Sequence, residues 1–242
     1  MDYKYQGIIL GKKDIAEVDR IYTIYTLEMG KIRVIGKGVR KPNAKLAGAI
    51  ESVTYCEIFI SRTKGLGKIT GSIVVNNFPN IKSDIDFIQR VFYVFKILDK
   101  LISEQEKDEE IFYLILGYLE SVERLSGDEA KLDILTMGLL FKLLSELGYG
   151  LEVERCTSCT GRLFQENNYF SVSRGGVLCK NCAASENKKI KISNEAIKIM
   201  RIFFKNRVEN LIKLRVPAKD IQDLRLVMQE ALVWISGNRY SI

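Results

Sequence analysis

The chain of 242 residues contains no histidine. This absence excludes the Ser-His-Asp and Cys-His arrangements of nucleophilic catalysis, and it removes the most common general base near neutral pH. Two glycine-rich stretches, 36–41 and 65–70, match neither the G-x4-G-K-[ST] nor the G-x-G-x2-G phosphate-binding pattern, and we interpret them as turns. The sequence therefore predicts a protein that is not an enzyme.

Long apolar runs are also missing. No stretch approaches the roughly 18 apolar residues that a membrane-spanning helix requires, and residues 1–5 lack the apolar segment of a signal peptide. Hydrophobic residues nevertheless make up 47% of the chain, which is enough for the core of one large domain or of two to three small ones. We therefore expect a globular, cytoplasmic protein with no membrane partner.

Cysteine is scarce, but four of the five cysteines form two C-x2-C pairs separated by nineteen residues. The pairs are Cys156 with Cys159 and Cys179 with Cys182. Each C-x2-C turn directs two sulfurs at one point, and this spacing lets the second pair complete a tetrahedron around Zn²⁺. Two disulfides or four free buried thiols are the alternatives. Since four thiolates fill the coordination sphere, we predict one structural zinc ion in a zinc ribbon at about residues 152–184, with a short strand at 169–172. The fifth cysteine, Cys56, is predicted to be a core residue.

The net charge of +7 is unevenly distributed. It is +6 over residues 1–80, −6 over 81–150 and +7 over 151–242, which suggests that the two ends contact a polyanion. The stretch 31–45 carries six basic residues and no acidic one: Lys31, Arg33, Lys37, Arg40, Lys41 and Lys45. We predict that these six bind nucleic acid, with a loop kept soluble by its charge as the alternative. The C-terminal candidates for a second basic surface are Lys188, Lys189, Lys191, Arg201 and Lys205.

The first 80 residues contain five strand-like runs, at 5–10, 21–27, 31–36, 52–61 and 68–76. Five short strands separated by turn signals predict a closed barrel, and the OB-fold is the best five-stranded candidate. Such barrels commonly bind single-stranded nucleic acid with a basic groove and aromatic rings. The candidate rings are Tyr3, Tyr5, Tyr22 and Tyr25, although half-buried packing is the commoner role of a strand tyrosine.

From Ser83 onward, the apolar period changes from two residues to about 3.6. Helices are predicted to begin at Ser83, Asp108, Asp128 and Ser193, and a last helix is predicted between Pro217 and Gly237. We expect the helices before and after the ribbon to pack as one bundle. The predicted fold is thus α+β, with an OB-fold barrel at 1–80 and a helical domain at 81–242 that carries the ribbon.

In this order, the motifs resemble the RecO family of bacterial recombination mediators. The resemblance rests on Gly7–Leu10, the acid before the second strand, the run Tyr25–Arg40, Gly65–Gly67, and the cysteine pairs with Gly175–Leu178 between them. It spans nearly the whole chain, and the combination of these motifs is its most specific part. One departure lies at Lys41–Lys45, where the family more often has a serine ahead of the leucine.

The resemblance implies a DNA repair and recombination mediator that binds single- and double-stranded DNA and anneals complementary strands. It also implies that the protein works with RecR and single-strand-binding protein, and that with RecR it helps to load RecA onto DNA coated by single-strand-binding protein. The residues alone leave two other hypotheses open. One is an RNA-binding OB-fold and zinc-ribbon module of translation or transcription, and the other is an enzyme that uses the zinc, which four thiolate ligands disfavour.

Overall fold

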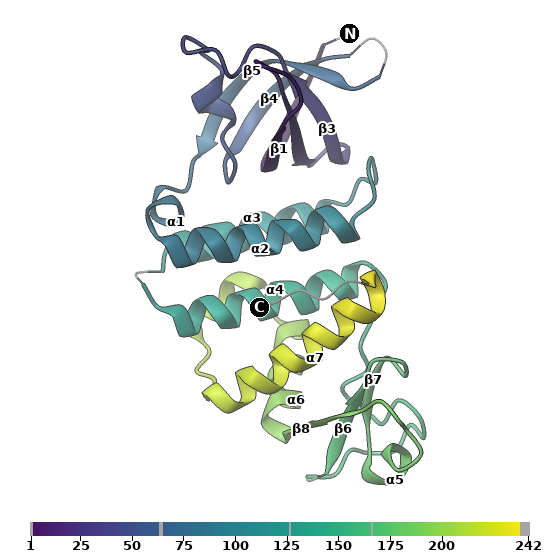
Figure 1. Cartoon of the computed structure of the whole chain (residues 1–242). Helices are drawn as coiled ribbons and strands as arrows, with labels where there is room; N and C mark the ends of the chain where they lie inside the picture. Colours follow the sequence, from purple (N-terminus) through teal and green to yellow (C-terminus); the bar gives the residue numbers. More distant parts are fainter. Residues whose placement is uncertain (1, 63–64, 126, 166, 238–242) are drawn as a thin grey trace. The chain divides into compact units, whose positions relative to one another are not determined.

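The computed structural model describes residues 2–62, 65–125, 127–165 and 167–237, and it confirms the α+β class. The chain divides into two compact units, residues 1–124 and 125–242. The first contains a β-barrel with helices α1 to α3, and the second contains α4 to α7 with a small sheet (Figure 1). The division of the chain into domains near residue 80 stays a prediction. Among the described residues, no helix is both long and apolar enough to cross a membrane.

Five strands form the predicted closed barrel. They are β1 (Asp2–Asp14), β2 (Arg20–Thr26), β3 (Gly30–Gly36), β4 (Tyr55–Ser61) and β5 (Gly67–Asn76). The barrel closes in the order β1-β2-β3-β5-β4, and β3 and β5 are its parallel pair, with Val34 opposite Gly67. Alternate residues point inward, as in β4, where Cys56, Ile58 and Ile60 are buried in the barrel core. Cys56 is thus a core residue, as predicted, and burial raises the pKa of its thiol.

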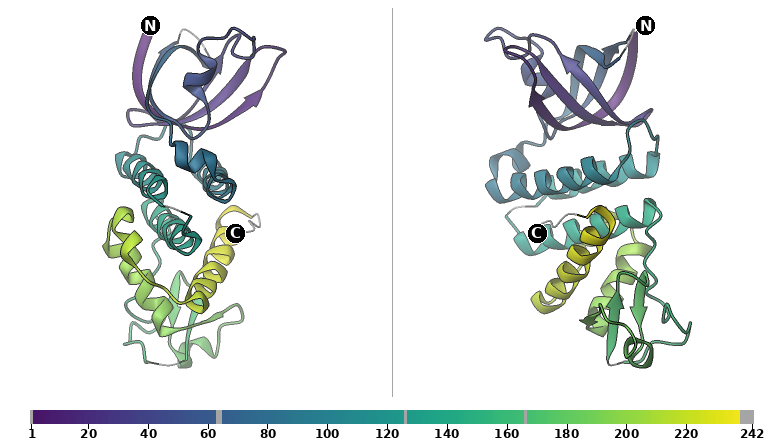
Figure 2. Two further views of the ribbon diagram at one scale, coloured as in Figure 1. Left: turned by 90° about the vertical axis from the view of Figure 1, so that its left-hand side faces the viewer. Right: turned by 45° about the vertical axis from the view of Figure 1, so that its right-hand side comes forward.

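Three helices complete the first unit: α1 (Pro79–Ser83), α2 (Ile85–Leu101) and α3 (Glu109–Glu123). The predicted cap at Ser83 is wrong, because Ser83 ends the short helix α1 and the carboxylate of Asp84 caps α2 instead. The cap at Asp108 is confirmed. Helices α2 and α3 lie side by side at one end of the barrel (Figure 2), where Phe112 of α3 packs against the rings of Tyr25 and Tyr55.

The second unit is built on α4 (Glu129–Glu146), α6 (Asn194–Lys205) and α7 (Ala218–Ser236), and the short helix η2 (Val208–Lys213) connects α6 to α7. The predicted caps at Asp128 and Ser193 and the stop at Gly237 are confirmed. Helix α4 packs against both α6 and α7, so the helix before the ribbon and those after it share a core.

The ribbon lies between α4 and α6. It contains the strands β6 (Asn168–Ser171), β7 (Gly176–Leu178) and β8 (Ile190–Ile192), in the sheet order β7-β6-β8, and the one-turn helix α5 (Lys180–Ala183). The antiparallel β6–β7 pair brings Tyr169 opposite Leu178, directly before the second cysteine pair. The hairpin thus returns the chain to the first pair, as the spacing predicts.

Candidate metal centre and nucleic-acid interface

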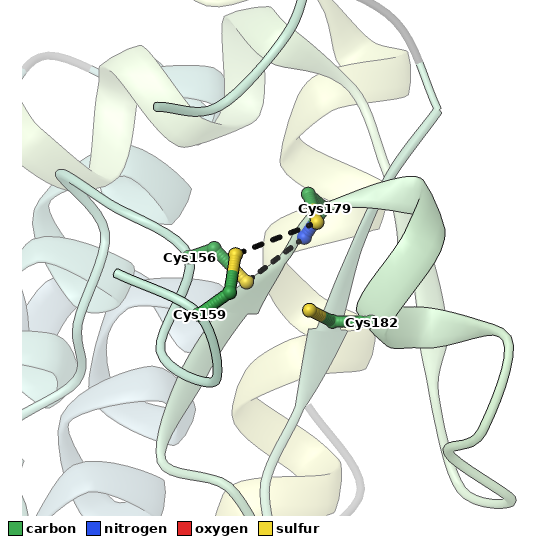
Figure 3. A group of neighbouring side chains, drawn as sticks. All are labelled: Cys156, Cys159, Cys179 and Cys182. Atoms are coloured by element: carbon green, nitrogen blue, oxygen red, sulfur yellow. Dashed lines mark hydrogen bonds between the residues drawn. The ribbon is translucent and has the colours of Figure 1, made fainter. Parts of the chain in front are cut away.

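The four paired cysteines converge on one point (Figure 3). Cys156 and Cys159 lie in a turn in which the Thr160 N–H donates to the Cys156 carbonyl, while Cys179 precedes α5 and Cys182 lies within it. Their Sγ atoms all lie within 4.8 Å of one another, and those of Cys159 and Cys179 are 4.0 Å apart. Four sulfurs at about 2.3 Å from a shared zinc ion would be about 3.8 Å apart in a tetrahedron. The cluster therefore could hold a metal ion after a small contraction.

The pKa shifts of two of the thiols, Cys156 and Cys182, also fit a bound cation. Burial acts to raise the pKa of Cys156, but backbone N–H groups of residues 159, 179 and 158 outweigh it and lower the pKa to about 6. Side-chain hydrogen bonds with Cys159 and then Cys179 raise the pKa of Cys182 to about 12. Cys156 thus ionises readily, whereas Cys182 becomes a thiolate near neutral pH only when a cation compensates its charge.

The basic loop, which we define as residues 37–45, follows β3 and is anchored to the β1–β2 turn. Gly38 has the positive φ of +66° that glycine tolerates best, and its N–H donates to the Asp19 carboxylate at 2.7 Å. The Arg40 N–H donates to the Val18 carbonyl, and the Arg40 guanidinium pairs with Asp14 at 3.4 Å. These bonds hold the loop in a defined conformation.

Lys37, Lys41 and Lys45 are exposed on this loop. None of the three forms an ion pair with a residue that the structure describes. Their ammonium groups can therefore reach phosphates without first breaking an ion pair with any of these described residues. The Arg40 side chain is also exposed, but its guanidinium already pairs with the Asp14 carboxylate and donates a hydrogen bond to the Ala16 carbonyl.

Lys31, one of the six residues predicted to bind nucleic acid, is buried. Lys31 is only 3% exposed, and its ammonium donates to the backbone carbonyl and the carboxylate of Asp99 in α2. Gly30 explains the close approach, since a Cβ there would lie 1.8 Å from the Glu106 carbonyl oxygen. The β3 face that carries Lys31 is thus covered by the end of α2 and the segment after it.

Arg33 is partly exposed, but its guanidinium already has carboxylate partners. Its side chain is 43% exposed, and its guanidinium pairs with Glu104 at 3.1 Å and with Asp99 at 3.5 Å. A phosphate would have to compete with these two carboxylates for Arg33. Of the six predicted basic residues, Lys31 is therefore structural, Arg33 is engaged, and the remaining four lie together on the basic loop.

Several C-terminal basic residues also have structural partners. The guanidinium of Arg201 donates to the Val153 carbonyl at 2.9 and 2.7 Å and pairs with Glu154, which also binds Lys205. Lys189 donates to the Ala183 carbonyl. The contacts of Arg201 and Lys205 join the ribbon to α6. Lys188 and Lys191 are left as exposed candidates of the predicted second surface.

The four candidate tyrosines separate into two groups. Tyr22 and Tyr25 are fully buried, which confirms packing as their role. Tyr3 is 38% exposed and Tyr5 is half-buried, and their rings stack at 5.9 Å with an interplanar angle of 5°. Sequence reasoning missed the positioning roles of Asp19 and Asp99, because single acidic residues in a loop or a helix carry no pattern that identifies their partners.

Comparisons with known proteins cover both compact units. Residues 1–78 match the family model described as "Recombination protein O N terminal", and residues 83–239 match the model described as "Recombination protein O C terminal". The chain is 30% identical to the DNA repair protein RecO of Dehalococcoides mccartyi over 247 residues, which cover 98% of this chain and 96% of that protein. It is 27% identical to the protein of the same name from Bacillus pumilus, with 97% and 89% coverage, and 27% identical to that from Desulforamulus reducens, with 88% and 82% coverage.

Proposed function

The chain belongs to the recombination protein O family of DNA repair proteins, and from this we propose that it is a recombination mediator that binds DNA and anneals complementary strands. The observation that carries the proposal is the anchored basic loop of the barrel. Three exposed lysines project from a backbone that Asp19 and Val18 hold in place, so binding a polyanion requires little ordering of the loop. Phosphate contacts of this kind carry no base information, as annealing of arbitrary sequences requires.

The proposed mediator catalyses no chemical reaction. The chain offers no histidine and no nucleotide-binding loop, and the four cysteines would complete the coordination sphere of Zn²⁺. One zinc ion, held by Cys156, Cys159, Cys179 and Cys182, stabilises the ribbon when bound. Its role is structural, since four thiolates leave no position for a water molecule.

The positive charge of the protein accounts for the proposed annealing. Single strands of DNA repel each other, and a protein with basic surfaces at both ends of its chain reduces that repulsion while bases pair. The barrel contributes Lys37, Arg40, Lys41 and Lys45, and the C-terminal part contributes Lys188 and Lys191. Arg33 can join them only in competition with Asp99 and Glu104. Double-stranded DNA binds the same surfaces through its phosphates.

The cellular role that we propose follows from family membership. The chain works in the bacterial cytoplasm with RecR and single-strand-binding protein, and it thereby helps RecA to load on single strands. The 1–80 barrel and the 81–242 helical domain with its ribbon are its two functional domains.

The experiment that tests this function measures the annealing of complementary DNA strands coated with single-strand-binding protein, with and without RecR, in the absence of nucleotide. The proposal expects annealing by the pure protein, more in the presence of RecR, and tighter binding to single-stranded DNA than to RNA. Preference for RNA with no annealing would favour a module of translation or transcription instead.

A further inference from the structure

The start of β1 carries an aromatic stack that begins in the barrel core. Tyr5 packs against the barrel core, and Tyr3 stacks on Tyr5 with nearly parallel rings. Residues two apart in a strand share a face, so this stack is a direct consequence of the spacing of the two tyrosines. Tyr3 is 38% exposed, although it carries a large aromatic side chain.

The surroundings of the stack combine apolar groups with charged groups of both signs. The two tyrosines line a shallow cleft whose floor is formed by Ile32, Val34 and Ile60 and whose rim includes Arg62, Leu66 and the ion pair of Arg33 with Glu104. Leu66 is 45% exposed, although it is a large apolar side chain. Aromatic rings beside a guanidinium and an apolar floor are the groups that hold unstacked bases in single-strand-binding barrels.

The size of the cleft determines how a base would bind. The volume of the cleft is only about 30 Å³, which is enough for one or two water molecules but far too small for a nucleobase. A base therefore cannot insert beneath the rings. It can only stack on the open surface of Tyr3 and extend the series that Tyr5 begins.

We propose that the Tyr3–Tyr5 stack is a nucleobase-binding site of the barrel, at which one base of a single DNA strand stacks on Tyr3 beside Arg62 and Leu66. This site rests on the proposed function, and it adds to phosphate binding by the basic loop a contact that only an unpaired base makes. Figure 2 draws the start of β1 and the loop after β3 at the same end of the barrel. A paired duplex keeps its base faces covered, so the site favours single strands.

The test compares two probes with equal numbers of phosphates: an oligothymidylate, and an oligonucleotide of the same length without bases. In the full-length protein, Tyr3→Ala is expected to weaken oligothymidylate binding by about 5- to 150-fold, the range for loss of one stacked base. Its binding of the abasic probe and its salt dependence remain those of the wild type. Tyr3→Phe retains binding because the ring remains, and Tyr149→Ala, which removes a ring of 40% exposure from the other compact unit, is the matched control.

A second measurement does not depend on the folding of a variant. An oligonucleotide with photoreactive 5-iodouracil, bound to the wild-type chain, is expected to crosslink within residues 2–6. Unchanged oligothymidylate binding by folded Tyr3→Ala, equal losses on both probes, or crosslinks only elsewhere would overturn the site. A wild-type chain that binds no single strand would instead refute the proposed function.

Discussion

The ammonium of Lys31 lies 3.2 Å from a carboxylate oxygen of Asp99, so a strand of the barrel is joined to helix α2 by a lysine that is almost completely buried. Burial of a charged group is unfavourable unless hydrogen bonds compensate it, and the Asp99 carbonyl and carboxylate do so here. This pair explains why Lys31 is buried, whereas Lys37, Lys41 and Lys45 of the same basic stretch are exposed.

Lys31→Met is expected to lower the free energy of unfolding by about 1–3 kcal/mol, since it removes hydrogen bonds made by a charged group. Chemical denaturation measures the loss. Lys37→Met, which makes the same change at an exposed site, is the control and should retain wild-type stability. A Lys31→Met chain with unchanged stability and a smaller salt dependence of DNA binding would show that Lys31 contacts phosphate.

Glu104→Gln is expected to strengthen DNA binding at low salt, because it releases the guanidinium of Arg33 from one of its two carboxylate partners. The slope of log affinity against log salt should steepen by up to about 0.7, which is the value for one additional phosphate contact with a single strand. Glu57→Gln, which releases Lys4 elsewhere on the barrel, makes the same change of net charge. Equal effects of the two variants would mean that net charge alone is responsible.

Metal analysis of the purified chain is expected to find one zinc ion. Cys159→Ser should lose this ion and destabilise the second compact unit, because the binding energy of a structural zinc ion contributes to folding. Single-strand binding by the barrel should change much less. Cys56→Ala is the matched control, since that thiol lies in the barrel core, and it should keep the zinc. Metal-free protein with oxidised thiols in reducing buffer would contradict the assignment.

Stability is expected to fall as the pH rises above about 10. Burial, followed by the charges of Asp108 and Glu106, raises the pKa of Tyr25 above its ordinary value of 10.0, and burial also raises those of Tyr22 and Tyr55. The unfolded chain then releases these protons while the folded chain retains them, so the stabilisation is complete below pH 10 and is lost as the pH approaches the folded pKa values.

Tyr25→Phe tests this pH dependence. The variant loses the hydrogen bond to the Asp108 carbonyl and should be about 1 kcal/mol less stable at neutral pH. Its stability should nevertheless fall less steeply above pH 10, as urea denaturation at several pH values would show. A slope equal to that of the wild type would mean that Tyr25 does not contribute to the alkaline loss.

Local signals in the sequence predicted much of the fold. The caps at Asp108, Asp128 and Ser193 depend only on the residues that follow them, and the cysteine spacing is itself a geometric constraint. Strand alternation places Lys31 on the face of β3 opposite to Ile32 and Val34, yet all three residues are buried. The pattern indicates which residues share a face, but Asp99, which covers Lys31, is 68 residues away in sequence.

The tyrosines show the same limit. Tyr5 and Tyr25 are equally strand-like in sequence, but the packing of Phe112 from α3 buries Tyr25 while the start of β1 leaves the Tyr3–Tyr5 stack at the surface. Which ring a helix covers depends on tertiary contacts that no short window of sequence contains.

The most direct test of the account is the salt dependence of single-strand binding by a triple variant of the basic loop: Lys37→Gln, Lys41→Gln and Lys45→Gln. If all three lysines contact phosphates, the slope of log affinity against log salt falls by about 2, at about 0.7 for each contact. Glutamine at Lys96, Lys100 and Lys107 removes the same charge outside the loop, and that variant should retain most of the slope. Wild-type affinity and slope in the loop variant would contradict the central claim that this loop binds the DNA backbone.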